Sequence, residues 1–183
     1  TDKGLKTRGA QHIYIDDMRI YDFRSGLDMT NANQSEIFNV ILVANSTDTT
    51  SRGLYFQYPR PYNEMNNITI RNCWVGIEHQ GKMLDHYENI TVINCHNGFE
   101  GHSLYSDVNP SSWYRKTMDN ITQGYLYKVD FRQCTNDINI TDDWGLDFNL
   151  VGYNIGYDTS KVRTGTNRTF WHYGAKNLYK TDE

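Results

Sequence analysis

The chain has 183 residues, which is enough for one domain with its own hydrophobic core. Its net charge is −4 and its acidic and basic residues are interspersed, so it lacks the basic patch of a nucleic-acid-binding protein. No apolar run reaches the roughly 18 residues that a membrane-spanning helix needs, so we expect no membrane insertion.

The N-terminal part of the chain is predicted to form short strands separated by polar turns. Residues 12–23 alternate apolar and polar side chains, which is typical of a half-buried strand. Residues 36–43 are almost continuously apolar, as in parallel strands that are packed on both faces. A Ser/Thr/Asp-rich loop at 45–52 precedes a short strand at 53–56, and the prolines within 58–62 favour an extended excursion.

A repeat with a period of 22 residues follows. The stretch Asn67–Glu78 (NITIRNCWVGIE) is succeeded by Asn89–Glu100 (NITVINCHNGFE), and seven of the twelve positions are identical. A fixed period in the low twenties on short β-type runs indicates a solenoid whose coils stack on one another. No segment has helical periodicity with a capping residue before it, which disfavours a βαβ fold with helical crossovers.

The C-terminal part of the chain is less periodic. Residues 103–124 interrupt the repeat and are predicted to form a loop that leaves the solenoid, often the binding face in repeat proteins. A strand resumes over 125–134, and 145–183 is a less regular, aromatic region. We therefore predict an all-β, right-handed parallel β-helix of about five or six coils, one domain over 1–183 that is a segment of a longer protein.

Stacked coils place aligned residues in columns, and three columns define the predicted register. The apolar column, expected to face the core, is Leu27, Leu54, Ile77, Phe99 and Ile138. The next position points outward by strand alternation and gives Asp28, Tyr55, Glu78, Glu100 and Asn139. Two residues further along lie Thr30, Gln57, Gln80, His102 and Thr141. The last two columns share one face of the molecule.

This outward strip of carboxylates, amides and hydroxyls would suit a polyhydroxylated ligand such as a polysaccharide, which offers donors and acceptors at regular intervals. The predicted sugar-binding residues are Tyr55, Gln57, Gln80, His102, Asn139 and Trp113. The alternative is that these polar columns are only a solvated surface, as any β-helix exposes.

Glu78 and Glu100 are the predicted catalytic pair, because neighbouring coils are about 4.8 Å apart. That brings the carboxyl groups near the ~5–5.5 Å separation of retaining glycosidases. Like charges at such a distance repel by roughly 3 kcal/mol at an effective dielectric constant of ~20, which would leave one acid protonated and the other ionised. Asp28 is a third candidate carboxylate in the same column. The alternative is that both glutamates splay into solvent.

Two further columns are predicted to be structural. Cys73, Cys95 and Cys134 fall in one column as buried thiols, and a Cys73–Cys95 disulfide is within reach of stacked coils but not required. No Cys-x-x-Cys or His-x-x-x-His spacing indicates zinc, so we expect no metal site. Asn67 and Asn89 match the N-glycosylation sequon, but we interpret them as turn residues of the coil whose amides stack.

The runs Asn67–Cys73 and Asn89–Cys95 resemble the single-stranded right-handed parallel β-helices of the pectin-lyase-like superfamily, over roughly residues 12–140. That superfamily includes pectate lyases, polygalacturonases, alginate epimerases and bacteriophage tailspikes. The Gly-His-Gly motif of polygalacturonases is absent, and Gly101-His102-Ser103 is the nearest fragment. The chain is most similar to phage tailspike and tail-appendage β-helices, which are rich in Asn, Tyr and Gly.

The resemblance implies an extracellular or virion-surface homotrimer that recognises a host-surface polysaccharide. In one version it also cleaves the polysaccharide, as a glycoside hydrolase or a polysaccharide lyase. No cofactor is expected unless it is a lyase, which would use Ca²⁺ on acids such as Asp16-Asp17 or Asp142-Asp143. The alternatives are a free-standing lyase, hydrolase or epimerase, and a non-catalytic structural shaft, since fold does not fix function.

Overall fold

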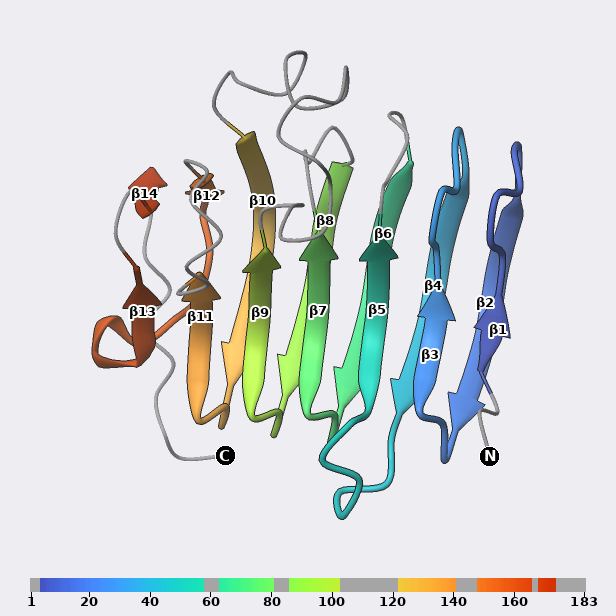
Figure 1. Cartoon of the computed structure of the whole chain (residues 1–183), viewed down its shortest axis with the longest axis horizontal. Coiled ribbons are helices and arrows are strands. Elements are labelled where there is room, and N and C mark those ends of the chain that lie inside the picture. Colours follow the sequence, from blue (N-terminus) through green and yellow to red (C-terminus); the bar gives the residue numbers. More distant parts are fainter. Residues whose placement is uncertain are drawn as a thin grey trace, which may run out of the picture.

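The computed structural model describes residues 4–57, 63–80, 86–102, 122–140, 148–165 and 168–173. They form an all-β parallel solenoid of about five turns. Two parallel sheets of seven strands each make up its walls, one from the odd-numbered and one from the even-numbered strands. Figure 1 shows the odd-numbered sheet in front of the even-numbered sheet, with the strands of both running across the long axis. The predicted parallel β-helix is confirmed.

The strands alternate between the two sheets along the chain. The odd-numbered sheet consists of β1 (Leu5–Lys6), β3 (Ser25–Asp28), β5 (Arg52–Gln57), β7 (Val75–Gln80), β9 (Asn97–His102), β11 (Asn136–Ile140) and β13 (Val162–Thr164). The even-numbered sheet consists of β2 (Tyr14–Tyr21), β4 (Glu36–Val43), β6 (Glu64–Arg71), β8 (His86–Ile93), β10 (Thr122–Arg132), β12 (Phe148–Tyr153) and β14 (Arg168–Tyr173). A single 3-10 turn, η1 (Thr159–Lys161), precedes β13.

The core lies between the two sheets, and its main ladder has the predicted register. The aligned residues are paired from strand to strand and are all fully buried: Leu27, Leu54, Ile77, Phe99 and Ile138. Leu5 on β1 and Val162 on β13 extend the same ladder to both ends of the solenoid. Burial of a side chain of this size stabilises the fold by about 1.5–3 kcal/mol. The predicted inward column is therefore confirmed.

A glycine column beside this ladder is required by close approach of the two sheets. A Cβ atom on Gly76 would lie 2.4 Å from Val92 Cγ1 and 2.6 Å from the carbonyl oxygen of Gly98. Gly53 has the same surroundings one strand earlier, with Ile70 Cγ2 at 2.4 Å and the Gly76 oxygen at 2.5 Å. Any larger residue would push neighbouring strands apart, so the repeat keeps glycine here.

Asparagine columns bend the long strands of the even-numbered sheet. Asn39, Asn67 and Asn89 have φ values of 54°, 55° and 53°, a left-handed conformation that Asn tolerates better than most residues. The Asn67 amide donates to Asn39 Oδ1 at 2.6 Å. A second ladder follows each of these strands, where the Asn94 amide donates to Asn72 Oδ1 at 2.9 Å. The predicted stacking of amides is confirmed for Asn72 and Asn94. Asn67 and Asn89 were predicted to lie in turns but lie inside β6 and β8, and the Asn89 amide donates to Asn66 Oδ1.

The cysteines and the C-terminal part of the chain can be compared with their predictions, whereas most of the predicted loop cannot. Cys73, Cys95 and Cys134 are buried free thiols, so the disulfide considered from the sequence is not formed. Within 145–183, the strands β12, β13 and β14 continue both sheets. The predicted loop at 103–124 lies outside the described residues as far as position 121. In the ranges that the structure describes, no helix is long and apolar enough to cross a membrane.

Candidate functional site

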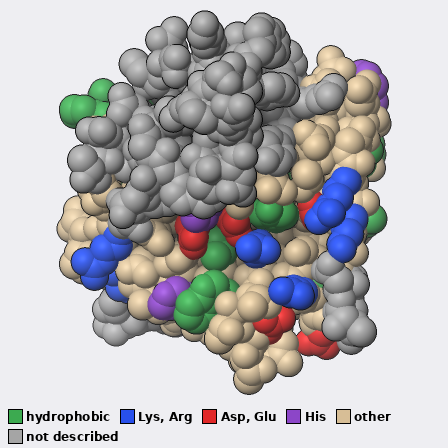
Figure 2. Space-filling view, in the orientation of Figure 1, with side chains coloured by type: hydrophobic (Ala, Val, Ile, Leu, Met, Phe, Trp, Pro, Cys, Tyr) green, Lys and Arg blue, Asp and Glu red, His purple; other side chains and the backbone are tan. Residues whose placement is uncertain are grey.

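A pocket of about 420 Å³ lies on the outer face of the odd-numbered sheet. Its walls come from β5, β7 and β9, from the loop before β5 and from the turns that precede β3 and β7. The lining residues are Arg24, Thr49, Thr50, Arg52, Trp74, Val75, Glu78, Gln80, Glu100 and His102. Figure 2 shows acidic, basic and histidine side chains gathered near the middle of this face.

The strand geometry explains how residues that alternation would place on opposite faces of β7 both line this pocket. Val75 and Glu78 both line the pocket, whereas Ile77 between them lies in the core. Strict alternation would place Val75 and Ile77 on the same face. The chain therefore switches face at the glycine column, and Arg52, which pairs with Val75 in register, also faces outward. Strict alternation of inward and outward side chains therefore could not predict Arg52 as a pocket residue.

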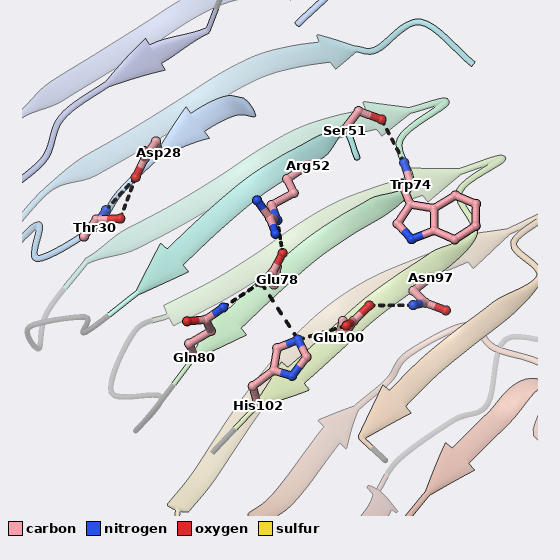
Figure 3. A network of polar contacts seen from close by, with 10 residues as sticks. All are labelled: Asp28, Thr30, Ser51, Arg52, Trp74, Glu78, Gln80, Asn97, Glu100 and His102. Atoms are coloured by element: carbon pink, nitrogen blue, oxygen red, sulfur yellow. Dashed lines mark hydrogen bonds and ion pairs between the residues drawn. The ribbon is translucent and has the colours of Figure 1, made fainter. Parts of the chain in front are cut away.

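Glu78 is a buried carboxylate held by three neighbours. Only 3% of the residue is exposed, and its Oε2 forms an ion pair with the Arg52 guanidinium. The Gln80 amide donates to Oε1 at 2.7 Å. A buried charge persists only where it is paired and hydrogen-bonded, and both conditions are met here. Figure 3 shows Arg52, Gln80 and His102 converging on this side chain from three strands.

Glu100 lies opposite Glu78 in the parallel register, as predicted. Its Oε1 is 2.9 Å from His102 Nε2, and its Oε2 accepts a hydrogen bond from the Asn97 amide. Burial alone would raise the pKa of Glu100, but the hydrogen bond and charge of His102, the Asn97 amide and the charge of Arg52 together lower it. Glu100 therefore stays ionised to a lower pH than an ordinary glutamate, which does not fit the role of a protonated acid.

The two carboxylates share one histidine. His102 Nε2 also lies 3.9 Å from Glu78 Oε1, so that oxygen and Glu100 Oε1 are less than about 7 Å apart. This limit includes the separation of about 5–5.5 Å found in retaining glycoside hydrolases. Figure 3 shows the imidazole between the two carboxylates. The arrangement can accept and donate protons at one point on the outer face.

Asp28, the third predicted catalytic carboxylate, is not part of the pocket. It pairs in register with Tyr55, which in turn pairs with Glu78, so it lies two strands away from Glu78. The Arg8 guanidinium contacts Asp28 Oδ2 at 2.8 Å, and the Thr30 hydroxyl donates to Oδ1 at 2.6 Å. Asp28 is 1% exposed, and these contacts give it a structural role at the end of β3.

The predicted sugar-binding residues divide between the pocket and its surroundings. Gln80 and His102 line the pocket, whereas Gln57 and Asn139 occupy neighbouring positions in the same columns outside it. Tyr55 was expected to face a ligand but is 8% exposed, and the Arg52 guanidinium covers its ring with Cζ 4.8 Å from the centroid. Burial, followed by the charge of Glu78, raises the pKa of Tyr55. Trp113 lies outside the described residues.

Trp74 supplies the aromatic surface of the pocket. Its ring stacks on the imidazole of His96 with centroids 3.9 Å apart and planes 9° apart, and 38% of the residue is exposed. The Ser51 hydroxyl oxygen accepts a hydrogen bond from the Trp74 backbone N–H at 2.9 Å, which ties the backbone of Trp74 to the loop before β5. The column register does not include Trp74, because this residue precedes β7, the strand that the alternation describes.

The described residues contain no group of three or more His, Cys, Asp and Glu side chains arranged to hold a metal ion. Of the acids considered as calcium ligands, Asp16 instead accepts hydrogen bonds from the Asn39 amide at 2.7 Å and from the Tyr14 hydroxyl at 3.2 Å. Asp142 and Asp143 lie outside the described residues.

Comparisons with known proteins do not add a family to these observations. No protein-family model, no curated protein and no solved structure matches this chain.

Proposed function

We propose that this β-helix binds a polysaccharide in the pocket over β5, β7 and β9. The observation that carries the proposal is an exposed aromatic ring beside a dense set of hydrogen-bonding groups in one hollow of about 420 Å³. Trp74 offers a flat apolar surface for the C–H face of a sugar ring. Glu78, Glu100 and Gln80 offer acceptors and donors for its hydroxyl groups.

The rigidity of the site favours binding over a merely solvated surface. Trp74 is held by His96 and by the loop before β5, and both glutamates are already oriented by neighbouring side chains. A site ordered before binding loses less conformational entropy when the ligand arrives. A polar surface that only faces water would not need a fixed, exposed aromatic ring beside its carboxylates.

We assign the chain to a phage tail spike or tail appendage, with a polysaccharide of the host surface as ligand. This assignment rests on the resemblance of the coil sequence and on the elongated β-helix with a polar lateral site. The alternative is a non-catalytic shaft, in which contacts with other molecules are made elsewhere on the chain, for example by the aromatic C-terminal part.

Binding is tested with immobilised bacterial capsular and cell-wall polysaccharides, followed by titration of a soluble oligosaccharide from the best ligand. We expect Trp74→Ala to weaken binding at least tenfold, or about 1.4 kcal/mol. Trp171→Ala, which removes an exposed aromatic residue of β14 far from the pocket, should leave the Kd unchanged. If the loss follows Trp171 instead of Trp74, or if no polysaccharide binds, the shaft alternative is favoured.

A second candidate function is hydrolysis of the bound glycan, favoured by the two carboxylates that share His102. Glu100, whose pKa is lowered, is the candidate base or nucleophile. The acid role would fall to His102, which lies between the two carboxylates, because Arg52 and Gln80 hold Glu78 as a carboxylate. This function requires binding in the same pocket, whereas binding does not require hydrolysis.

Release of new reducing ends from the polysaccharide that binds best tests the second function. Glu78→Gln and Glu100→Gln should each lower the rate by about 100-fold or more, because each removes one of the two carboxylates that flank His102. Glu88→Gln serves as the matched control, since Glu88 pairs with Lys128 on the even-numbered sheet. Full activity in both pocket variants would rule out a catalytic role for Glu78 and Glu100.

A further inference from the structure

Exposed aromatic residues concentrate at the two ends of the solenoid. Among the described residues, four of the five large exposed hydrophobic side chains lie on the edge strands β2 and β14 of the even-numbered sheet. Tyr14 and Tyr21 on β2 are 64% and 54% exposed, and Trp171 and Tyr173 on β14 are 55% and 53% exposed. Figure 1 shows these two strands at opposite ends of the long axis.

Both ends of the core are also apolar. Several hydrophobic side chains at the ends are only partly buried although they pack against the core: Leu5, Ile13, Met18 and Ile20 at one end, and Val162 and Phe170 at the other. Natural solenoids usually close with polar terminal repeats, and edge strands usually carry charges or prolines that block further pairing. The edge strand β2 does carry the charged residues Asp16, Asp17 and Arg19. The exposed aromatic side chains of β2 and β14 nevertheless offer apolar surface that a further strand would cover.

The two ends match in register. Leu5 and Val162 are the first and last members of the same inward ladder. On the other sheet, strand pairing carries Tyr14 through Glu36 and Glu64 to His86. The offset between β8 and β10 puts Tyr125 in the His86 column, and pairing continues from Tyr125 through Val151 to Trp171. Tyr14 and Trp171 therefore belong to one column.

A stack of aromatic rings also runs out to the end of the solenoid. Tyr127, Tyr153 and Tyr173 stack with centroid distances of 5.0 Å and 5.6 Å and interplanar angles of 7° and 23°. Tyr173 is the last described member of this stack and is half-exposed. One more strand in the same register would cover its outer face.

We propose that copies of this chain stack head to tail along the solenoid axis. In this arrangement β14 of one copy pairs in parallel with β2 of the next, and β13 pairs with β1. Trp171 would then lie next to Tyr14, and Val162 next to Leu5, at the ordinary strand spacing of about 4.8 Å. Because the interface joins two different surfaces and involves no closing rotation, the product is an open filament.

One column opposes this association at low ionic strength. Lys6 and Arg163 are the two ends of the column that contains Glu78, so stacking would place these like charges in neighbouring strands. Their repulsion is screened by salt, since the Debye length falls to about 8 Å at physiological ionic strength. The filament should therefore lengthen as salt is raised.

Sedimentation of the full chain at increasing concentration tests the proposal. The wild-type average mass should rise continuously from 21.4 kDa with protein concentration and with salt. Tyr14→Lys and Trp171→Lys each place a charge on an exposed edge position and should each give monomers. Trp74→Lys changes an exposed aromatic residue away from the ends and should behave as the wild type.

Mixing the two edge variants gives the decisive result. Tyr14→Lys keeps an intact β14 end and Trp171→Lys keeps an intact β2 end, so an equimolar mixture should form dimers and nothing larger. Formation of that dimer also shows that both variants are folded. A wild type that stays monomeric at 200 µM, a concentration-independent trimer, or edge variants that assemble alone as the wild type does would each overturn the proposal.

Discussion

Each carboxylate in the column through Glu78 is stabilised by its own positively charged or hydrogen-bonding partner. Glu78 and Asp28 are both almost fully buried, and each has an arginine partner, Arg52 and Arg8 respectively. Glu100 is less buried and relies on His102 and Asn97. The same type of position in the coil thus produces one structural carboxylate at Asp28 and two carboxylates that line the pocket, Glu78 and Glu100.

Glu100 should contribute to the pH dependence of stability. Its native pKa is lower than its ordinary value of 4.5, so the unfolded state binds more protons between the two values. The contribution of Glu100 is present above pH 4.5 and is lost as the pH falls through its native pKa. We therefore expect Glu100→Gln to flatten the acid side of the stability curve.

Urea unfolding between pH 3 and pH 7 measures this difference. Glu88→Gln is again the matched control, because the pKa of Glu88 is also lowered by His86 and Lys128 but its ion pairs face solvent. The control should change the curve less than Glu100→Gln does. An acid limb that is identical in wild type and Glu100→Gln would contradict this account of Glu100.

At the scale of the strand, the asparagines with positive φ show which residue a long strand of the even-numbered sheet needs where it bends. Asn67 lies in the middle of β6 with a positive φ, which costs an ordinary residue roughly 1–2 kcal/mol. Its amide also donates to Asn39. Backbone conformation and side-chain hydrogen bond together explain why the Asn-Ile-Thr run repeats, without any need for a glycan on these residues.

Substitution of Asn67 separates the two contributions. Asn67→Ala loses the hydrogen bond and keeps the strained φ, whereas Asn67→Gly loses the hydrogen bond but tolerates the conformation. We expect Asn67→Ala to lower the free energy of unfolding by about 2 kcal/mol and Asn67→Gly by about 1 kcal/mol less than that. Equal losses in urea unfolding, or a larger loss for glycine, would show that φ is not the main constraint.

The molecule as a whole was predictable from the sequence where one coil repeats the next. The 22-residue period and the apolar ladder through Leu54, Ile77 and Phe99 fixed the stacking and the pairing of Glu78 with Glu100. The pocket was only partly predictable, because alternation assumes a straight strand and the chain switches face at Gly53 and Gly76. Arg24 and the threonines of the 45–52 loop come from turns that differ between coils, and no periodicity describes them.

The direction of the inter-strand hydrogen bonds has a mechanical consequence. They run along the long axis, so a pull on the two ends loads every junction between coils in series, and the shortest junctions fail first. In the odd-numbered sheet those lie toward the ends, where β1 pairs with β3 through two residues. The pairs β3–β5, β9–β11 and β11–β13 each share three. The central strands β5, β7 and β9 pair through longer stretches. Under tension the odd-numbered sheet should open from its ends inward, and its pocket should be among the last parts to lose its shape.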